Sequence, residues 1–82
     1  MISESTIAYA QEESERIAKK WGDQSKLPDL MALSVLVEEV GEVAMAMNDC
    51  EGDDNLHAEL IQVATVALRW ADRVGRRFQE DY

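Results

Sequence analysis

Small and apolar residues recur at helical intervals in three segments of the chain, and the first segment lies near the N-terminus. Its repeating positions are Ile7, Ala10, Ser14, Ile17, Ala18 and Trp21. This three-to-four-residue spacing predicts an amphipathic helix, which Ser3 or Ser5 can cap. Gly22 is placed to end it, because glycine tolerates the left-handed geometry found beyond helix C-termini.

The second segment is predicted to be a helix from about Leu30 to Met47, with Pro28 and Asp29 as its start signals. One stripe of this helix is apolar. It consists of Leu33, Val37, Val40, Ala44 and Met47. Gly41 lies in the middle of this predicted helix, where a glycine lowers helix stability by about 0.5–1 kcal/mol relative to alanine.

The third segment is expected to begin near Leu56, after a cap at Asp53, Asp54 or Asn55, and to continue through Val74 toward Phe78. No stretch alternates as a strand would, and the glycines and the proline lie almost wholly at segment boundaries. We therefore predict an all-α fold, with residues 1–82 forming a single helical domain.

The length and charge of the chain narrow its possible partners. A chain of 82 residues buries only about 60% of its unfolded surface, so we expect a helical bundle completed by oligomerisation, as a homodimer or homotetramer. The formal net charge is −9, from 17 acidic and 8 basic residues. Such an acidic chain is unsuited to a nucleic-acid polymer or an anionic membrane. An anionic ligand such as a nucleotide would need a cation between itself and the protein.

The cellular compartment is also indicated. The lone Cys50 cannot form an intramolecular disulfide, and the N-terminal stretch lacks the basic and apolar regions of a signal peptide. The longest nearly apolar run, LMALSVLV, is far short of the roughly 20 residues of a membrane span. We expect a cytoplasmic protein that does not enter the membrane.

Carboxylates fall where core residues are expected. On a helical wheel Glu39 and Glu42 lie roughly 60° apart among apolar neighbours. Glu59 is near the centre of the apolar face of the last helix, with Gln62 roughly 60° to one side. The carboxylates of Glu39 and Glu42, three residues apart on one helix, repel each other by about 3 kcal/mol at an effective dielectric near 20. Either a hard divalent cation binds them, or cationic side chains such as Arg69 neutralise them as ion pairs.

Two segments resemble a known family. VEEVGEVAMAM and ELIQVATVALRWAD are similar to the signature helices of MazG-like proteins, which belong to the all-α nucleoside triphosphate pyrophosphatase superfamily. The family pattern is EExxE followed, after a variable gap, by ExxD. Glu38, Glu39 and Glu42 match the first part, and Glu59 opens the second. AKKWGDQSKLPD also resembles the segment before the first motif, so the likeness covers roughly residues 19–74.

The resemblance implies an enzyme with MazG-like architecture that hydrolyses a nucleoside triphosphate to the monophosphate and pyrophosphate. It implies Mg²⁺ as cofactor, with Mn²⁺ possible, and Glu39, Glu42 and Glu59 as its ligands. Glu38 would ligate a second metal or orient the attacking water. These four glutamates are the predicted catalytic residues.

The chain departs from the pattern at Gln62, which stands where the family has aspartate. A glutamine offers a carbonyl oxygen to the metal but no charge, so we interpret it as a variant metal ligand. This predicts that Gln62→Asp tightens metal binding. The alternative is a non-catalytic nucleotide-binding or helical assembly protein with a degenerate metal site.

Further residues are candidates for binding the substrate. Trp21 could stack on a base and Gln24 could hydrogen-bond to its edge, although Trp21 could equally be packing. Lys20 and Arg69 could contact phosphates, with helix-end electrostatics or a salt bridge as the alternatives. Trp70 shares the Glu59 face and would either line the pocket or fill the core.

Overall fold

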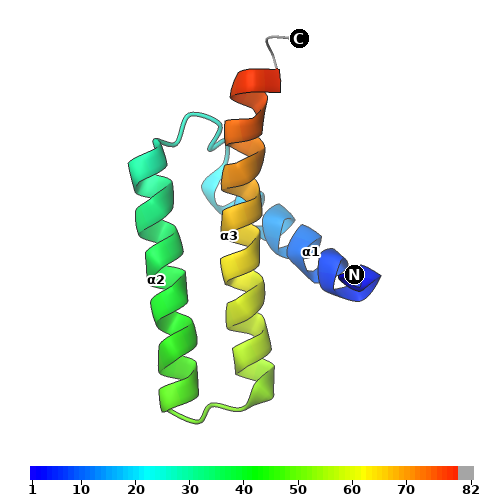
Figure 1. Cartoon of the computed structure of the whole chain (residues 1–82), viewed down its shortest axis with the longest axis vertical. Helices are drawn as coiled ribbons and strands as arrows, with labels where there is room; N and C mark the ends of the chain where they lie inside the picture. Colours follow the sequence, from blue (N-terminus) through cyan, green and yellow to red (C-terminus); the bar gives the residue numbers. More distant parts are fainter. Residues whose placement is uncertain (80–82) are drawn as a thin grey trace.

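The computed structural model describes residues 1–79 and consists of three helices (Figure 1). They are α1 (Glu4–Trp21), α2 (Asp29–Asn48) and α3 (Asp53–Gln79). No strand occurs within these residues, which confirms the all-α prediction. None of the three helices combines the length and apolarity needed to cross a membrane. The last three residues of the predicted domain lie outside the described part.

Both ends of α1 follow the expected signals, whereas the start of α3 does not. The Ser3 hydroxyl caps α1 by accepting a hydrogen bond of 3.2 Å from the backbone N–H of Thr6. Gly22 ends α1 at φ 71°, and its N–H donates to the carbonyl of Ala18 at 2.9 Å. The start of α3 was predicted wrongly, because α3 begins at Asp53 and the three expected cap residues Asp53, Asp54 and Asn55 lie inside it. Asp53 and Asp54 occupy its first turn, where the helix dipole favours acidic residues.

Helix α3 is the central element of the fold. Helices α2 and α3 lie side by side and antiparallel, and α1 crosses α3 at an angle (Figure 1). Within residues 1–79, α1 and α2 both pack on α3 but not on each other. A functional site in this fold is therefore assembled around α3.

The start of α2 is tied to the far end of α3. One carboxylate oxygen of Asp29 accepts a hydrogen bond of 2.9 Å from the indole N–H of Trp70. Arg77 donates to both oxygens of the same carboxylate, at 2.9 and 2.6 Å. These hydrogen bonds hold the pKa of Asp29 well below its usual range. Asp29 thus links the start of α2 to Trp70 and Arg77 of α3.

The core of a single chain is thin. Only Ile17, Ala32, Ala46 and Thr65 are buried within the described part. The Thr65 hydroxyl donates to the carbonyl of Ile61 at 2.7 Å, so this buried polar group has a partner. The chain exposes 6376 Å², whereas a compact monomer of this mass exposes roughly 4,900 Å². The surplus agrees with a chain that needs further packing.

The predicted apolar stripe of α2 faces away from α3. Its four larger residues, Leu33, Val37, Val40 and Met47, are 45–64% exposed. A different face of α2, which contains Ala32, Glu39 and Ala46, packs on α3. The apolar stripe is therefore a surface of the single chain.

Candidate metal centre

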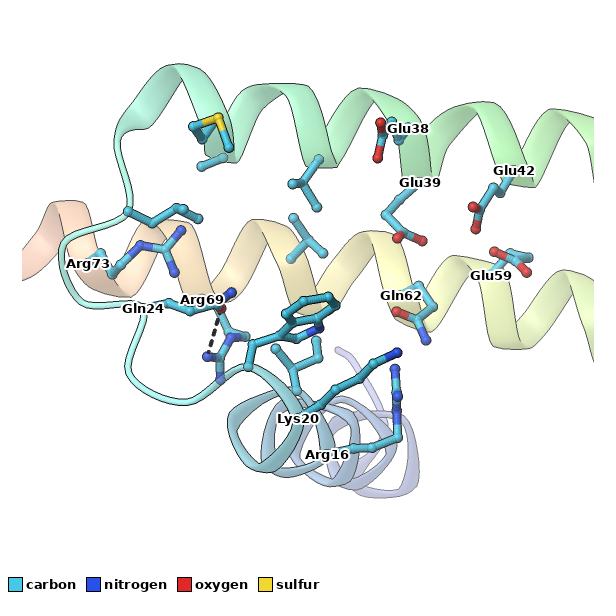
Figure 2. A pocket seen from close by; sticks show the side chains of 17 residues that line it. Arg16, Lys20, Gln24, Glu38, Glu39, Glu42, Glu59, Gln62, Arg69 and Arg73 are labelled. Carbon is cyan, nitrogen blue, oxygen red and sulfur yellow. Dashed lines mark hydrogen bonds between the residues drawn. The ribbon is translucent and has the colours of Figure 1, made fainter.

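Three carboxylates from two helices converge at the interface of α2 and α3. Glu39 and Glu42 project from α2 and Glu59 from α3 (Figure 2). Each residue offers one oxygen, and these oxygens all lie within 4.8 Å of one another. Glu39 and Glu42 share a face because residues three apart are neighbours on a helix. The antiparallel packing of α3 then brings Glu59 opposite them.

Two oxygens of this cluster are buried without a partner. In the described part of the chain, neither Glu39 Oε2 nor Glu59 Oε2 has a hydrogen-bond donor. Burial raises the pKa of both carboxyls, and the nearby charge of Glu42 raises each pKa further. The cluster is thus electrostatically costly as it stands, since buried carboxylates are normally paired or hydrogen-bonded.

Arginines do not neutralise the cluster within the chain. None of the ion pairs formed within residues 1–79 involves Glu39, Glu42 or Glu59. The cluster therefore has the composition of a hard-cation site, because Mg²⁺ and Mn²⁺ prefer carboxylate oxygens. Its three carboxylates match the positions that the sequence singled out.

A cavity of about 500 Å³ adjoins the carboxylates. The glutamates lie toward one end of it, and Arg69 and Arg73 lie toward the other (Figure 2). Arg16 and Lys20 of α1 line a further side. The cavity thus combines an acidic end with basic walls, an arrangement that suits an anionic ligand carrying a metal.

Glu38 has a different position from the other three glutamates. It lines the cavity and is exposed, but it is not part of the cluster within 4.8 Å. Glu38 therefore does not share the arrangement that would let the other three glutamates hold one cation. Its position at the cavity wall is compatible with the predicted role in orienting water.

Gln62 also lines the cavity, one turn from Glu59. Its side-chain amide donates a hydrogen bond of 2.7 Å to Glu13 of α1. The sequence analysis did not identify Glu13. A signal was present, because Glu13 falls three residues after Ala10 and four before Ile17 and so lies on the inner face of α1.

The substrate-binding candidates separate into two groups. Trp21, Lys20, Gln24 and Arg69 all line the cavity. Trp21 is 63% exposed there, and the Lys20 ammonium lies 5.2 Å from its ring centroid. Trp70 is not among the lining residues, and its indole N–H is engaged by Asp29.

Arg69 and Arg73 differ in their partners. Arg69 donates to Ser14 and to the side-chain oxygen of Gln24, the latter at 3.3 Å (dashed in Figure 2). Arg73 lines the cavity with its Nε buried and without an acceptor in residues 1–79. Burial and the neighbouring charge of Arg69 lower the pKa of Arg73. Arg73 is therefore the arginine better placed to meet an anionic ligand.

Comparisons of the chain with protein-family models, with curated proteins and with solved structures find no match. The likeness to MazG-like proteins therefore stays a prediction from the two sequence segments. What the structure adds is independent of that likeness, namely a carboxylate cluster from two helices and an adjoining cavity.

Proposed function

We propose that this protein is a Mg²⁺-dependent nucleoside triphosphate pyrophosphohydrolase, with Mn²⁺ as a possible substitute. The observation that carries the proposal is the convergence of Glu39, Glu42 and Glu59, two of whose oxygens are buried without a donor among residues 1–79. A divalent cation would supply the missing positive charge. It would also bridge an acidic protein and the anionic triphosphate, which the net charge of −9 otherwise repels.

In the proposed reaction, water attacks the α-phosphorus of the triphosphate, and the bond from that phosphorus to the oxygen bridging it to the β-phosphorus breaks. Pyrophosphate leaves with the electron pair of that bond, and the proton of the attacking water is released to solvent. The products are the nucleoside monophosphate and pyrophosphate. Glu39, Glu42 and Glu59 would hold the metal, which would supply charge stabilisation and make water a better nucleophile. Glu38, at the cavity wall, would accept a hydrogen bond from the attacking water.

The basic walls of the cavity would bind the rest of the substrate. Arg16 and Lys20 would screen the charge of the phosphates from the side of α1. Trp21 would stack on the base and Gln24 would hydrogen-bond to its edge. Arg73 would donate to an acceptor of the ligand, because its buried Nε has none in the described chain.

We also propose that the exposed stripe of α2 packs against a second copy of the chain. Leu33, Val37, Val40, Ala44 and Met47 alternate in spacings of four and three residues, which is the spacing of a helix–helix seam. Burying this stripe would reduce the large exposed area of the single chain. It would also leave the cavity open, because the stripe lies on a different face of α2.

The alternative is a non-catalytic nucleotide-binding or helical assembly protein. It is favoured by Gln62, which brings no charge to a position where the resembling family has aspartate. Such a protein would bind the metal and the nucleotide, or self-associate, without releasing pyrophosphate.

The deciding experiment measures pyrophosphate release from a panel of canonical and modified nucleoside triphosphates with Mg²⁺, with Mn²⁺ and with chelator. We expect release only in the presence of a divalent metal. Glu42→Gln should abolish it, whereas Glu12→Gln, the same change at an exposed position of α1, should leave it intact. Metal-dependent nucleotide binding without pyrophosphate release would favour the alternative instead.

A further inference from the structure

The contact between Gln62 and Glu13 joins α3 to α1 at the edge of the metal centre. The Gln62 Nε2 donates to Glu13 Oε2 at 2.7 Å. In this hydrogen bond the amide nitrogen of Gln62 is the donor, so it is the nitrogen that faces Glu13. The carbonyl oxygen is then the part of the amide left for the cavity. Figure 2 shows the nitrogen of Gln62 turned toward the side where Arg16 lies.

Glu13 is itself held firmly. Its side chain is only 11% exposed, although it lies on a helix that packs on one neighbour. Arg16, one turn further along α1, donates to both carboxylate oxygens of Glu13. This ion pair also raises the pKa of Arg16. Glu13 thus contacts both Arg16 and Gln62 through its carboxylate and accepts a hydrogen bond from each of them.

We propose that Glu13 is a positioning residue for Gln62, turning the amide so that its carbonyl oxygen faces the cation bound by Glu39, Glu42 and Glu59. This inference rests on the proposed function, because it needs a cation at the three glutamates. Side chains that hydrogen-bond to a metal ligand commonly set its orientation, and their loss costs about 10–100-fold in metal affinity. Glu13 would act on Gln62 in this way.

The inference reverses one expectation from the sequence. The sequence alone predicts that a carboxylate at position 62 strengthens the metal site. With Glu13 in place, however, a carboxylate there would meet another carboxylate where an N–H···O hydrogen bond now exists. Glu13 thus makes a neutral amide the suitable group at position 62.

The first part of the test measures the affinity for Mn²⁺ alone, by electron paramagnetic resonance of the unbound ion. Glu13→Ala should weaken binding by about tenfold, the lower end of the effect of losing such a partner. Glu13→Gln keeps an acceptor for the Gln62 amide and should bind Mn²⁺ within about twofold of the wild type. Glu12→Ala is the matched control, since it removes an exposed carboxylate from the same helix.

The second part of the test exchanges the amide of Gln62 and the carboxylate of Glu13. Gln62→Glu, which is isosteric, should bind Mn²⁺ no more tightly than the wild type and should unfold at a lower temperature. Adding Glu13→Gln to it restores the hydrogen bond in the reverse direction, at the same net charge as the wild type. We expect this double variant to bind Mn²⁺ at least tenfold more tightly than Gln62→Glu alone and to regain its thermal stability.

The direction in which Glu13→Gln changes the Mn²⁺ affinity of Gln62→Glu shows whether Glu13 acts by orienting the side chain at position 62 or through its charge. Counting charges alone predicts that removing a carboxylate near a cation site weakens Mn²⁺ binding in every background. Equal losses in Glu13→Ala and Glu13→Gln, or weaker binding in the double variant than in Gln62→Glu, would overturn the positioning role. If the wild type binds no Mn²⁺, the proposed function and this inference both fail. If the wild type binds Mn²⁺ but the variants do not follow the expected order, only the positioning role of Glu13 fails.

Discussion

Arg69 is bonded twice to Ser14 across the interface of α1 and α3. It donates to the Ser14 hydroxyl at 2.7 Å and to the Ser14 carbonyl at 3.1 Å. Arg73, one turn further along α3, has its Nε buried without an acceptor in the described residues. The two arginines of this cavity thus differ, because Arg69 links α1 to α3 whereas the Nε of Arg73 has no acceptor among residues 1–79.

This difference predicts opposite effects for two matched variants. Arg69→Met should lower the free energy of unfolding by about 1–2 kcal/mol, because it removes hydrogen bonds from a charged donor to α1. Arg73→Met should leave stability unchanged or slightly higher, since its charge is partly buried beside other arginines. It should raise KM for the triphosphate about tenfold with little change in kcat. Urea unfolding and steady-state kinetics measure both, and equal stability losses would contradict this division.

The carboxylate cluster should lower the stability of the metal-free protein while providing its affinity for a metal. Glu39→Gln removes one member of a group of like charges, so the metal-free protein should become more stable. We expect a gain of about 0.5–1 kcal/mol, because the cluster is partly solvated and the repulsion is screened. The same variant should lose most of the rise in melting temperature that Mg²⁺ gives the wild type. Melting in chelator and in Mg²⁺ measures both effects, and a less stable Glu39→Gln would argue against repulsion in the cluster.

The raised pKa values predict how stability depends on pH. Because the pKa values of Glu39 and Glu59 are raised on folding, the folded state binds more protons than the unfolded state above about pH 4.3. The stabilisation from these groups is complete below that pH and is lost as the pH rises through the raised values. The metal-free protein should therefore melt at a higher temperature at pH 5 than at pH 7.5.

The large net negative charge would favour the same trend, so variants are needed to isolate the cluster. The difference between the two pH values should shrink in Glu39→Gln and persist in Glu12→Gln, which removes one charge elsewhere. Affinity for Mn²⁺ should change in the opposite sense and rise with pH, because the metal binds the deprotonated carboxylates. An identical pH dependence in both variants would exclude the cluster as its source.

Self-association should depend on the exposed stripe of α2. Val40→Glu places a charge at the middle of the stripe and should halve the mass in solution if the wild type is a dimer. Met45→Glu is the control, because Met45 is an exposed apolar residue of the same helix that lies off the stripe. Light scattering coupled to size exclusion measures both masses. An unchanged mass in Val40→Glu would move the interface to another surface.

The positions of the helices were largely predictable from the sequence. Helical periodicity, the Ser3 cap and the Gly22 stop are local signals that act within a few residues, and α1 follows them. The same periodicity placed Glu39 and Glu42 on one face of α2. Asp29 was expected only to start α2, and its bonds to Trp70 and Arg77 were not predictable because the three residues are far apart in the chain.

By itself the sequence determined which residues share a helical face, since that depends only on the angle between successive residues. It thereby determined the three helices and the acidic candidates for the metal centre. Only the tertiary structure decided which face meets which helix. Packing across α3 brought Glu59 to Glu39 and Glu42, set Glu13 against Gln62, and left the stripe through Val40 exposed. These are contacts between distant segments, and no spacing along the chain specifies them.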